Sequence, residues 1–112
     1  MNKAEITWAD FAKLDIRTGT IEAAEVFEKA RVPAYQLHVN FGELGIKKTS
    51  AQITKRYKPE DLIGKQVLAV VNFPPKQIAN FMSECLILGA VEGDDVILIQ
   101  PDSKVINGLV IG

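Results

Sequence analysis

Residues 47–58, KKTSAQITKRYK, combine the side-chain types that contact phosphate groups. The stretch carries five basic side chains and no acidic one, although the whole chain has a net charge of -1. Lysine and arginine neutralise phosphate oxygens, Ser50 and Gln52 supply hydrogen bonds, and Tyr57 offers a plane for stacking. The same pattern is typical of a solvated strand followed by a solvated helix, so both interpretations stay open. The basic side chains are Lys47, Lys48, Lys55, Arg56 and Lys58.

A second candidate surface lies in the proline-containing stretch NFPPKQIANFMS. Phe73, Phe81 and Met82 stand close to two prolines, in a segment that cannot all be buried strand. They predict an apolar groove beside the cationic strand. The alternative is that Phe73 and Phe81 plug the open end of a barrel.

Catalytic and metal-binding residues are scarce. The only histidine, His38, lies in an alternating segment with no evident serine partner, so nucleophilic catalysis is not expected. One histidine and one cysteine are too few for a zinc site. The stretch GELGIKKT has Ile46 where a phosphate-binding loop needs glycine before its lysine, so it is interpreted as a turn.

Two acidic features have simpler explanations than a site. The turn EGDD, with Glu92, Asp94 and Asp95, lacks the further oxygen ligands that calcium requires and is interpreted as a solvated loop. Asp15 and Arg17 lie two apart on one strand, as a surface ion pair does. The sequence therefore predicts a binding protein without a catalytic site, a metal or a cofactor.

Composition sets the class of protein. A chain of 112 residues with thirteen basic and fourteen acidic side chains predicts one domain, residues 1–112, without a globally basic surface. The single cysteine, Cys85, lies in the apolar run ECLILGA and is expected to be a buried, reduced thiol, as in a cytoplasmic protein. The first residues lack the apolar core of a signal peptide, and no run is long enough to span a bilayer.

The elements that must position these residues are mostly strands. Segment 14–27 alternates with a change of parity at Gly19, which predicts a bulged, curved strand. YQLHVNF places Tyr35, Leu37, Val39 and Phe41 on one face, and the next strand, within 42–53, has a polar face. Trp8 and Phe11, after a Thr7 cap, predict a helical lid within residues 1–13.

The second half continues the β pattern. Pro59 and Gly64 bound a short helix, and the apolar runs 66–73 and 84–91 predict strands covered on both faces. Residues 74–83 between them are expected to form a structured loop. A Gly-Asp turn leads to a last core strand, and Asn107-Gly108 signals a C-terminal hairpin. These elements predict an all-β, five-stranded Greek-key barrel of the OB-fold class, with another small open barrel as the alternative.

Four stretches carry a family resemblance: LDIRTGTI, KKTSAQITKRY, VVNFPPKQIANFMSECLILGA and PDSKVINGLVIG. Together they resemble the CsaA chaperones of the tRNA-binding-domain family, over residues 14–112. The resemblance implies an OB-fold homodimer, formed partly through the hairpin region at the end of the chain. It also implies binding of unfolded or presecretory polypeptides in protein export. The alternative it implies is structure-specific tRNA binding on the same cationic face.

The resemblance places the family's polar strand positions on Lys48, Ser50 and Gln52, followed by Lys55 and Arg56. The loop of asparagine, aromatic residue and two prolines falls on residues 72–75, and the Ser-Glu pair falls on residues 83–84. Two departures follow: Lys76 and Gln77 replace a more basic pair, and Asn80 replaces a glycine and is expected to tolerate a left-handed turn. The candidate tRNA- or polypeptide-binding residues are Lys48, Ser50, Gln52, Lys55, Arg56, Tyr57, Asn72, Phe73, Lys76, Phe81, Met82 and Ser83.

Overall fold

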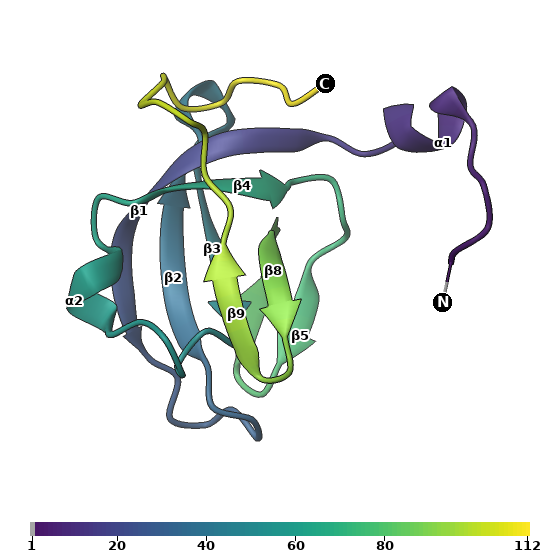
Figure 1. The fold of residues 1–112 in the computed structure, drawn as a ribbon. Coiled ribbons are helices and arrows are strands. Elements are labelled where there is room, and N and C mark those ends of the chain that lie inside the picture. The colour runs from purple at the N-terminus through teal and green to yellow at the C-terminus, as the bar shows by residue number, and fades with distance from the viewer. Residues whose placement is uncertain (1) are drawn as a thin grey trace.

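A curved antiparallel sheet forms the body of the protein, whose computed structural model describes residues 2–112 (Figure 1). Its five strands follow the order β3-β2-β1-β4-β7, with two separate two-stranded sheets, β5-β6 and β8-β9. The strands are β1 (Ile16–Val26), β2 (Tyr35–Asn40), β3 (Ile46–Ala51), β4 (Gln66–Val70), β5 (Lys76–Ile78), β6 (Phe81–Ser83), β7 (Leu86–Ile87), β8 (Gly89–Glu92) and β9 (Asp95–Leu98). The helical turns are α1 (Trp8–Ala12), η1 (Gly42–Leu44) and α2 (Pro59–Leu62). The nearly closed barrel confirms the predicted OB-fold class.

The alternation of β2 is as predicted. Leu37, Val39 and Phe41 are fully buried, Tyr35 is buried beside them, and His38 faces solvent. Side chains two residues apart share a face of a strand, so these residues build the inner layer of the main core.

The bulge of β1 forms, but three residues beyond Gly19. The pairing with β2 shifts register between Ile21 and Ala23. Gly19 is required for a steric reason and not for the bulge. A Cβ at this position would lie 2.7 Å from side-chain carbons of Val39 and Phe41. The glycine therefore lets the side chains of Val39 and Phe41 pack directly on the backbone of β1.

The short helix α2 matches its prediction. Pro59 occupies its first turn, Leu62 is fully buried, and Gly64 follows with a φ of +88°. A proline needs no amide hydrogen there, and a left-handed residue after the helix suits glycine.

The two apolar runs of the second half differ. In β4, Val67 and Ala69 are fully buried, as predicted. The run 84–91 is instead divided between β7 and β8, and Leu86 and Val91 are 50% and 74% exposed. The prediction that both faces are covered is wrong for this run, because β7 is an edge strand of the main sheet and β8 belongs to a separate two-stranded sheet.

Residues 74–83 form a hairpin and not the predicted loop. They contain the hairpin β5-β6, in which Lys76 pairs with Ser83 and Ile78 with Phe81. The left-handed residue of its turn is Ala79, with a φ of +52°, not Asn80. The prolines end the main sheet as expected, but they precede the new hairpin, so its ladder needs no donor from them.

The C-terminal segment makes the Asn107-Gly108 turn but no hairpin of its own. The amide of Gly108 donates to the carbonyl of Thr18 over 2.7 Å, and Ile111 donates to Ile16 over 2.9 Å. Pairing between β1 and β2 starts at Thr20, so the first residues of β1 have a free edge. The segment fills that edge, which is why it pairs with β1 rather than with itself.

The N-terminal helix α1 begins where the sequence indicates. Thr7 and Asp10 form a reciprocal capping box, with bonds of 3.0 and 3.1 Å. None of its residues is buried, and Trp8 is 90% exposed. The helix extends away from the barrel (Figure 1), so it does not lie over the core of its own chain as a lid. Within residues 2–112, no helix is long and apolar enough to cross a membrane.

Candidate functional site

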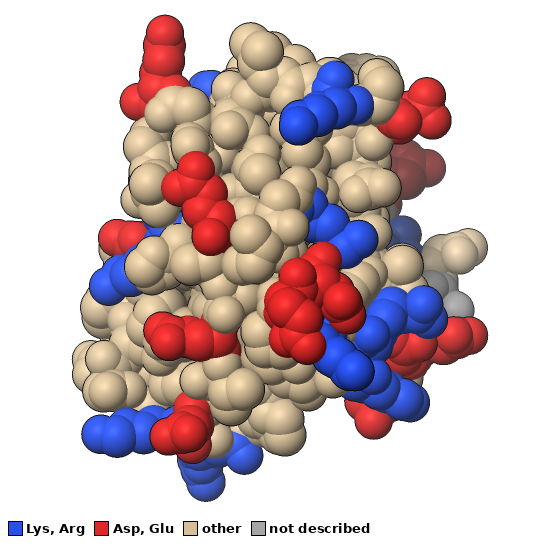
Figure 2. Space-filling view, turned by 90° about the vertical axis from the view of Figure 1, so that its left-hand side faces the viewer, with Lys and Arg blue, Asp and Glu red and all other residues tan. Residues whose placement is uncertain are grey.

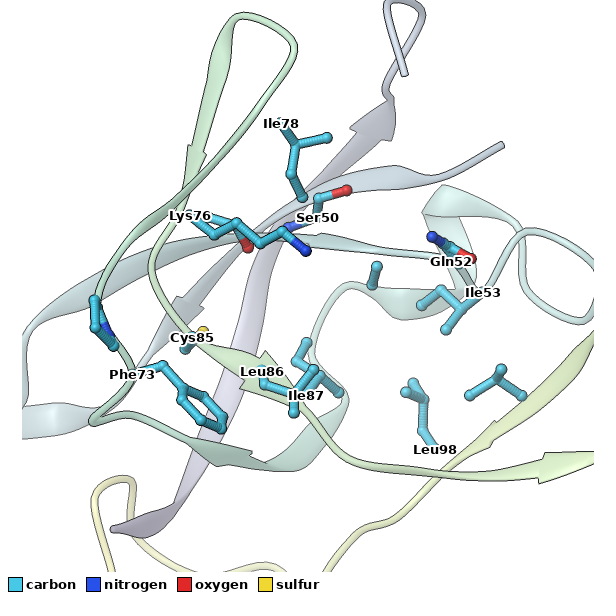
Figure 3. Close-up of a pocket in the computed structure, with 14 residues that line it drawn as sticks. Ser50, Gln52, Ile53, Phe73, Lys76, Ile78, Cys85, Leu86, Ile87 and Leu98 are labelled. Carbon is cyan, nitrogen blue, oxygen red and sulfur yellow. The ribbon is translucent and has the colours of Figure 1, made fainter. Parts of the chain in front are cut away.

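An apolar groove opens on the side of the barrel where β3, β7 and β9 approach one another (Figure 3). Its volume is about 530 Å³. Phe73 and Leu86, each 50% exposed, give it an apolar surface that water can reach. The other apolar lining residues are Ala51, Ile53, Pro74, Ile78, Cys85, Ile87, Val96 and Leu98, and the polar ones are Ser50, Gln52, Lys76 and Ser83. We call this the apolar groove.

The end of the groove is set by how β3 joins the segment before β7. The amide of Lys48 donates to Glu84 Oε1 over 2.8 Å, and the amide of Ser50 donates to Ser83 Oγ over 3.1 Å. Thr49 Oγ1 donates to the carbonyl of Cys85 over 2.7 Å. Side chains thus supply most of the bonds along this edge, beside one backbone bond from the Glu84 amide to the carbonyl of Lys48 over 2.7 Å. Past Ser50 the chain continues as the wall of the groove.

Cys85 is buried at the wall of the groove, as expected. Burial raises the pKa of its thiol to about 11, although Thr49 and Lys47 act in the opposite direction. At neutral pH the side chain is therefore a thiol and a weak nucleophile.

Two cations of the 47–58 stretch are held by the acidic turn between β8 and β9. Lys55 Nζ lies 2.8 Å from Asp94 Oδ1, and Arg56 Nη2 lies 2.7 Å from Asp95 Oδ2. The hydrogen bonds from Lys55 and Arg56 hold the pKa of the Asp94 and Asp95 carboxyls below their usual value. Figure 2 shows acidic side chains intermingled with basic ones over the face that it displays. The turn EGDD is exposed at Glu92, Gly93 and Asp94, as predicted for a solvated loop, and its two aspartates also neutralise part of the basic stretch.

Lys48 and Phe81 form a different unit. Phe81 is 8% exposed and packs on Phe27 with ring centroids 5.4 Å apart, in a small second core. Lys48 Nζ lies 5.3 Å from the centre of the Phe81 ring. Phe81 therefore does not line the groove, contrary to the prediction. Met82, which is 40% exposed on β6, does not line it either.

Tyr57 and Asn72 hold the fold together. The hydroxyl of Tyr57 accepts from the Leu98 amide over 3.0 Å, and its carbonyl accepts from Tyr35 Oη over 2.7 Å. Asn72 accepts from the Asp15 amide and donates to a backbone carbonyl before β1. The half-buried ring of Tyr57 is thus engaged in packing, so it is not the free stacking plane that the sequence suggested.

Five candidate residues meet at the groove and seven do not. Those that meet are Ser50, Gln52, Phe73, Lys76 and Ser83; the others are Lys48, Lys55, Arg56, Tyr57, Asn72, Phe81 and Met82. Sequence reasoning missed the β7 and β9 side of the groove, above all Leu86, Ile87 and Leu98. Their apolar character was a signal, but it predicted burial, since the exposure of an edge strand depends on the tertiary fold.

Metal ligands do not gather at the site. Across residues 2–112, no group of three His, Cys, Asp or Glu side chains could hold a metal ion.

Two solved structures of CsaA proteins are similar to this chain over nearly its whole length. The chain shares 57% identity with the crystal structure of the chaperone CsaA of Bacillus anthracis str. Ames, with a TM-score of 0.94, covering 97% of this chain and 100% of that one. The CsaA chaperone protein of Picrophilus torridus shares 52% identity with a TM-score of 0.91, covering 96% and 100%. The resemblance to CsaA chaperones is thus confirmed.

A longer relative carries the same domain. The methionine–tRNA ligase of Methanococcoides burtonii is 38% identical over 100 residues, which is 88% of this chain and 14% of the ligase. The sequence profile described as "Putative tRNA binding domain" matches residues 16–109. The chain therefore belongs to the tRNA-binding domain family.

Proposed function

We propose that this protein is a CsaA-type chaperone that binds unfolded or presecretory polypeptide segments in the apolar groove. The observation that carries the proposal is the half-exposed apolar surface at Phe73 and Leu86, within a hollow large enough for several side chains. Burial of apolar surface is not directional, so such a groove binds segments of many sequences. That property suits a chaperone, as do the CsaA neighbours of the chain.

The position of the groove along β3 favours an extended segment. Ser50 to Ile53 line it consecutively, so a bound chain would run beside the edge of the sheet. Edge strands recognise extended peptides by backbone hydrogen bonds, while neighbouring pockets take alternate side chains. Ser50 and Gln52 add polar groups at this edge.

A homodimer in the cytoplasm is part of the proposal. Exposed apolar side chains occur in the N-terminal segment, which extends away from the barrel, and in the C-terminal segment, whose residues 108–111 bond to the start of β1 (Figure 1). Exposed apolar side chains on a small domain favour a second copy as their cover, and we infer that these side chains form the patch that it covers. The side chains are Ile6, Trp8, Phe11, Leu14, Ile106 and Val110. Light scattering of the W8S/F11S variant should give a monomer if the patch forms the interface, and a dimer would contradict this.

The second candidate is tRNA binding. It is favoured by the family profile and by the basic stretch of residues 47–58. It is weakened by the ion pairs of Lys55 and Arg56, since a cation bound to an internal carboxylate contributes less to phosphate binding. We therefore place it after polypeptide binding.

Binding of tRNA and of a reduced, alkylated polypeptide, side by side across a salt series, tests the proposal. Polypeptide binding that tolerates salt, with weak tRNA binding, is the expected result because apolar contacts are not screened. Tight tRNA binding with a steep salt dependence, together with no polypeptide binding, would overturn it.

A further inference from the structure

The apolar groove continues into a second hollow of different character. This hollow has a volume of about 600 Å³ and lies beside the hairpin β5-β6 and the segment 30–34. Four residues, Ser50, Gln52, Lys76 and Ile78, line both. Figure 3 shows Lys76 and Ser50 at the groove, close to Ile78. A ligand in the groove can therefore reach the second hollow without leaving the surface.

The charges around the two hollows have one sign. Of the described residues that line them, Lys76 and Arg31 alone carry charge, and both are exposed. Within residues 2–112, neither has a carboxylate oxygen within 4.0 Å, in contrast to Lys55 and Arg56. Two cations with no internal partner border the same space, which we call the cationic hollow.

This arrangement has a consequence for the ligand. Apolar side chains suit the groove, whereas an anion between Lys76 and Arg31 lowers their mutual repulsion. A basic group at the same place would raise this repulsion. The two hollows adjoin, so one continuous ligand segment would place apolar side chains in the groove and an anion in the cationic hollow.

We propose that the groove selects polypeptide segments in which a short apolar stretch is followed by a carboxylate, from an acidic side chain or the C-terminal carboxyl group. This inference rests on the proposed function and adds the ligand's chemistry to it. The apolar stretch fills the groove beside Phe73 and Leu86, and the carboxylate lies in the cationic hollow. A phosphate-bearing ligand is less well suited, since its high charge gains nothing from the apolar wall.

Three labelled peptides test the inference, each with one alternating leucine and serine core followed by glutamates, glutamines or lysines. Fluorescence anisotropy should give a Kd for the glutamate peptide about fivefold lower than for the lysine peptide. The preference should disappear in R31Q/K76Q. It should persist in K3Q/K104Q, which removes two exposed positive charges outside both hollows.

The outcomes separate the inference from the proposed function. Equal binding of all three peptides would overturn the inference and leave polypeptide binding in place. A preference that survives in R31Q/K76Q would overturn the assignment of these two residues. Displacement of the glutamate peptide by uridine monophosphate at lower concentration than by free glutamate would assign the hollow to phosphate instead. Failure of every peptide to bind would overturn both proposals.

Discussion

Arg56 and Asp95 form a two-pronged pair between the segment after β3 and the start of β9. Arg56 Nε donates to Asp95 Oδ1 over 3.0 Å, and Nη2 donates to Oδ2 over 2.7 Å. The guanidinium group matches a carboxylate in the same geometry in which it matches a phosphate. Asp95 therefore binds the guanidinium group of Arg56, which the sequence predicts to contact nucleic acid.

Removal of the acidic partners should strengthen binding of tRNA. In D94N/D95N, Lys55 and Arg56 are released, so tRNA affinity should rise and the slope of log K against log salt should steepen by about 1 to 2. Filter binding between 50 and 300 mM salt measures both quantities.

Two controls separate released cations from a change in net charge. E5Q/E43Q removes two negative charges at exposed positions away from the β8-β9 turn, and it should raise affinity far less. K55Q/R56Q should abolish the gain when combined with D94N/D95N. A gain of equal size in all backgrounds would show that the ion pairs do not limit tRNA binding.

The seam between β3 and the segment before β7 should depend on Ser83. S83A removes the acceptor of the Ser50 amide and the neighbour of Thr49 Oγ1, which lies 3.2 Å from Ser83 Oγ. An amide left without its partner in a half-buried seam should lower the free energy of unfolding by about 1 kcal/mol. Urea denaturation measures the loss, and S103A, at an exposed position, should be neutral. An equally stable S83A would show that water replaces the hydroxyl.

The close approach of β1 and β2 makes Gly19 intolerant of a side chain. G19A places a Cβ 2.7 Å from carbons of Val39 and Phe41, so packing must shift at a cost of about 1–3 kcal/mol. G112A is the control, because its Cβ meets nothing within 4 Å. Thermal unfolding of the two variants should rank G19A as the less stable. The reverse order would contradict the packing described here.

The thiol of Cys85 predicts a dependence of stability on alkaline pH. Its pKa is about 11 in the folded protein, against an ordinary value of 9.0, so the unfolded chain loses the proton first. This contribution to stability is complete below about pH 9 and is lost as the pH approaches 11.

The measurement is the difference in unfolding free energy between the protein and its C85A variant, at pH 8 and at pH 10.5. Other groups titrate in the same window, so the difference isolates the thiol. It should shrink by about 1–2 kcal/mol at the higher pH. A constant difference would mean that Cys85 ionises as freely as in the unfolded chain.

Local patterns predicted the main strands well, because the polarity of most side chains in β2 and β4 matches their burial. Pro59 and Gly64 bound a helix through their backbone conformations alone. Local patterns failed where the outcome depends on distant segments. The bulge lies beyond Gly19, where it was predicted, because the register is set by pairing with β2. The C-terminal segment pairs with β1 and not with itself, because that edge of β1 is free. For the same reason the groove was found at Phe73 but not at Leu86, since the apolar run 84–91 does not reveal which strand lies at the edge.

The most direct test of the central claim is polypeptide binding by the F73A/L86S variant. Both side chains are half-exposed groove residues, so the fold should persist while affinity for a reduced, alkylated polypeptide falls about tenfold or more. M82A, which alters an exposed apolar residue that does not line the groove, should bind as the unmodified protein does. Unchanged affinity in a folded F73A/L86S variant would contradict polypeptide binding in the groove.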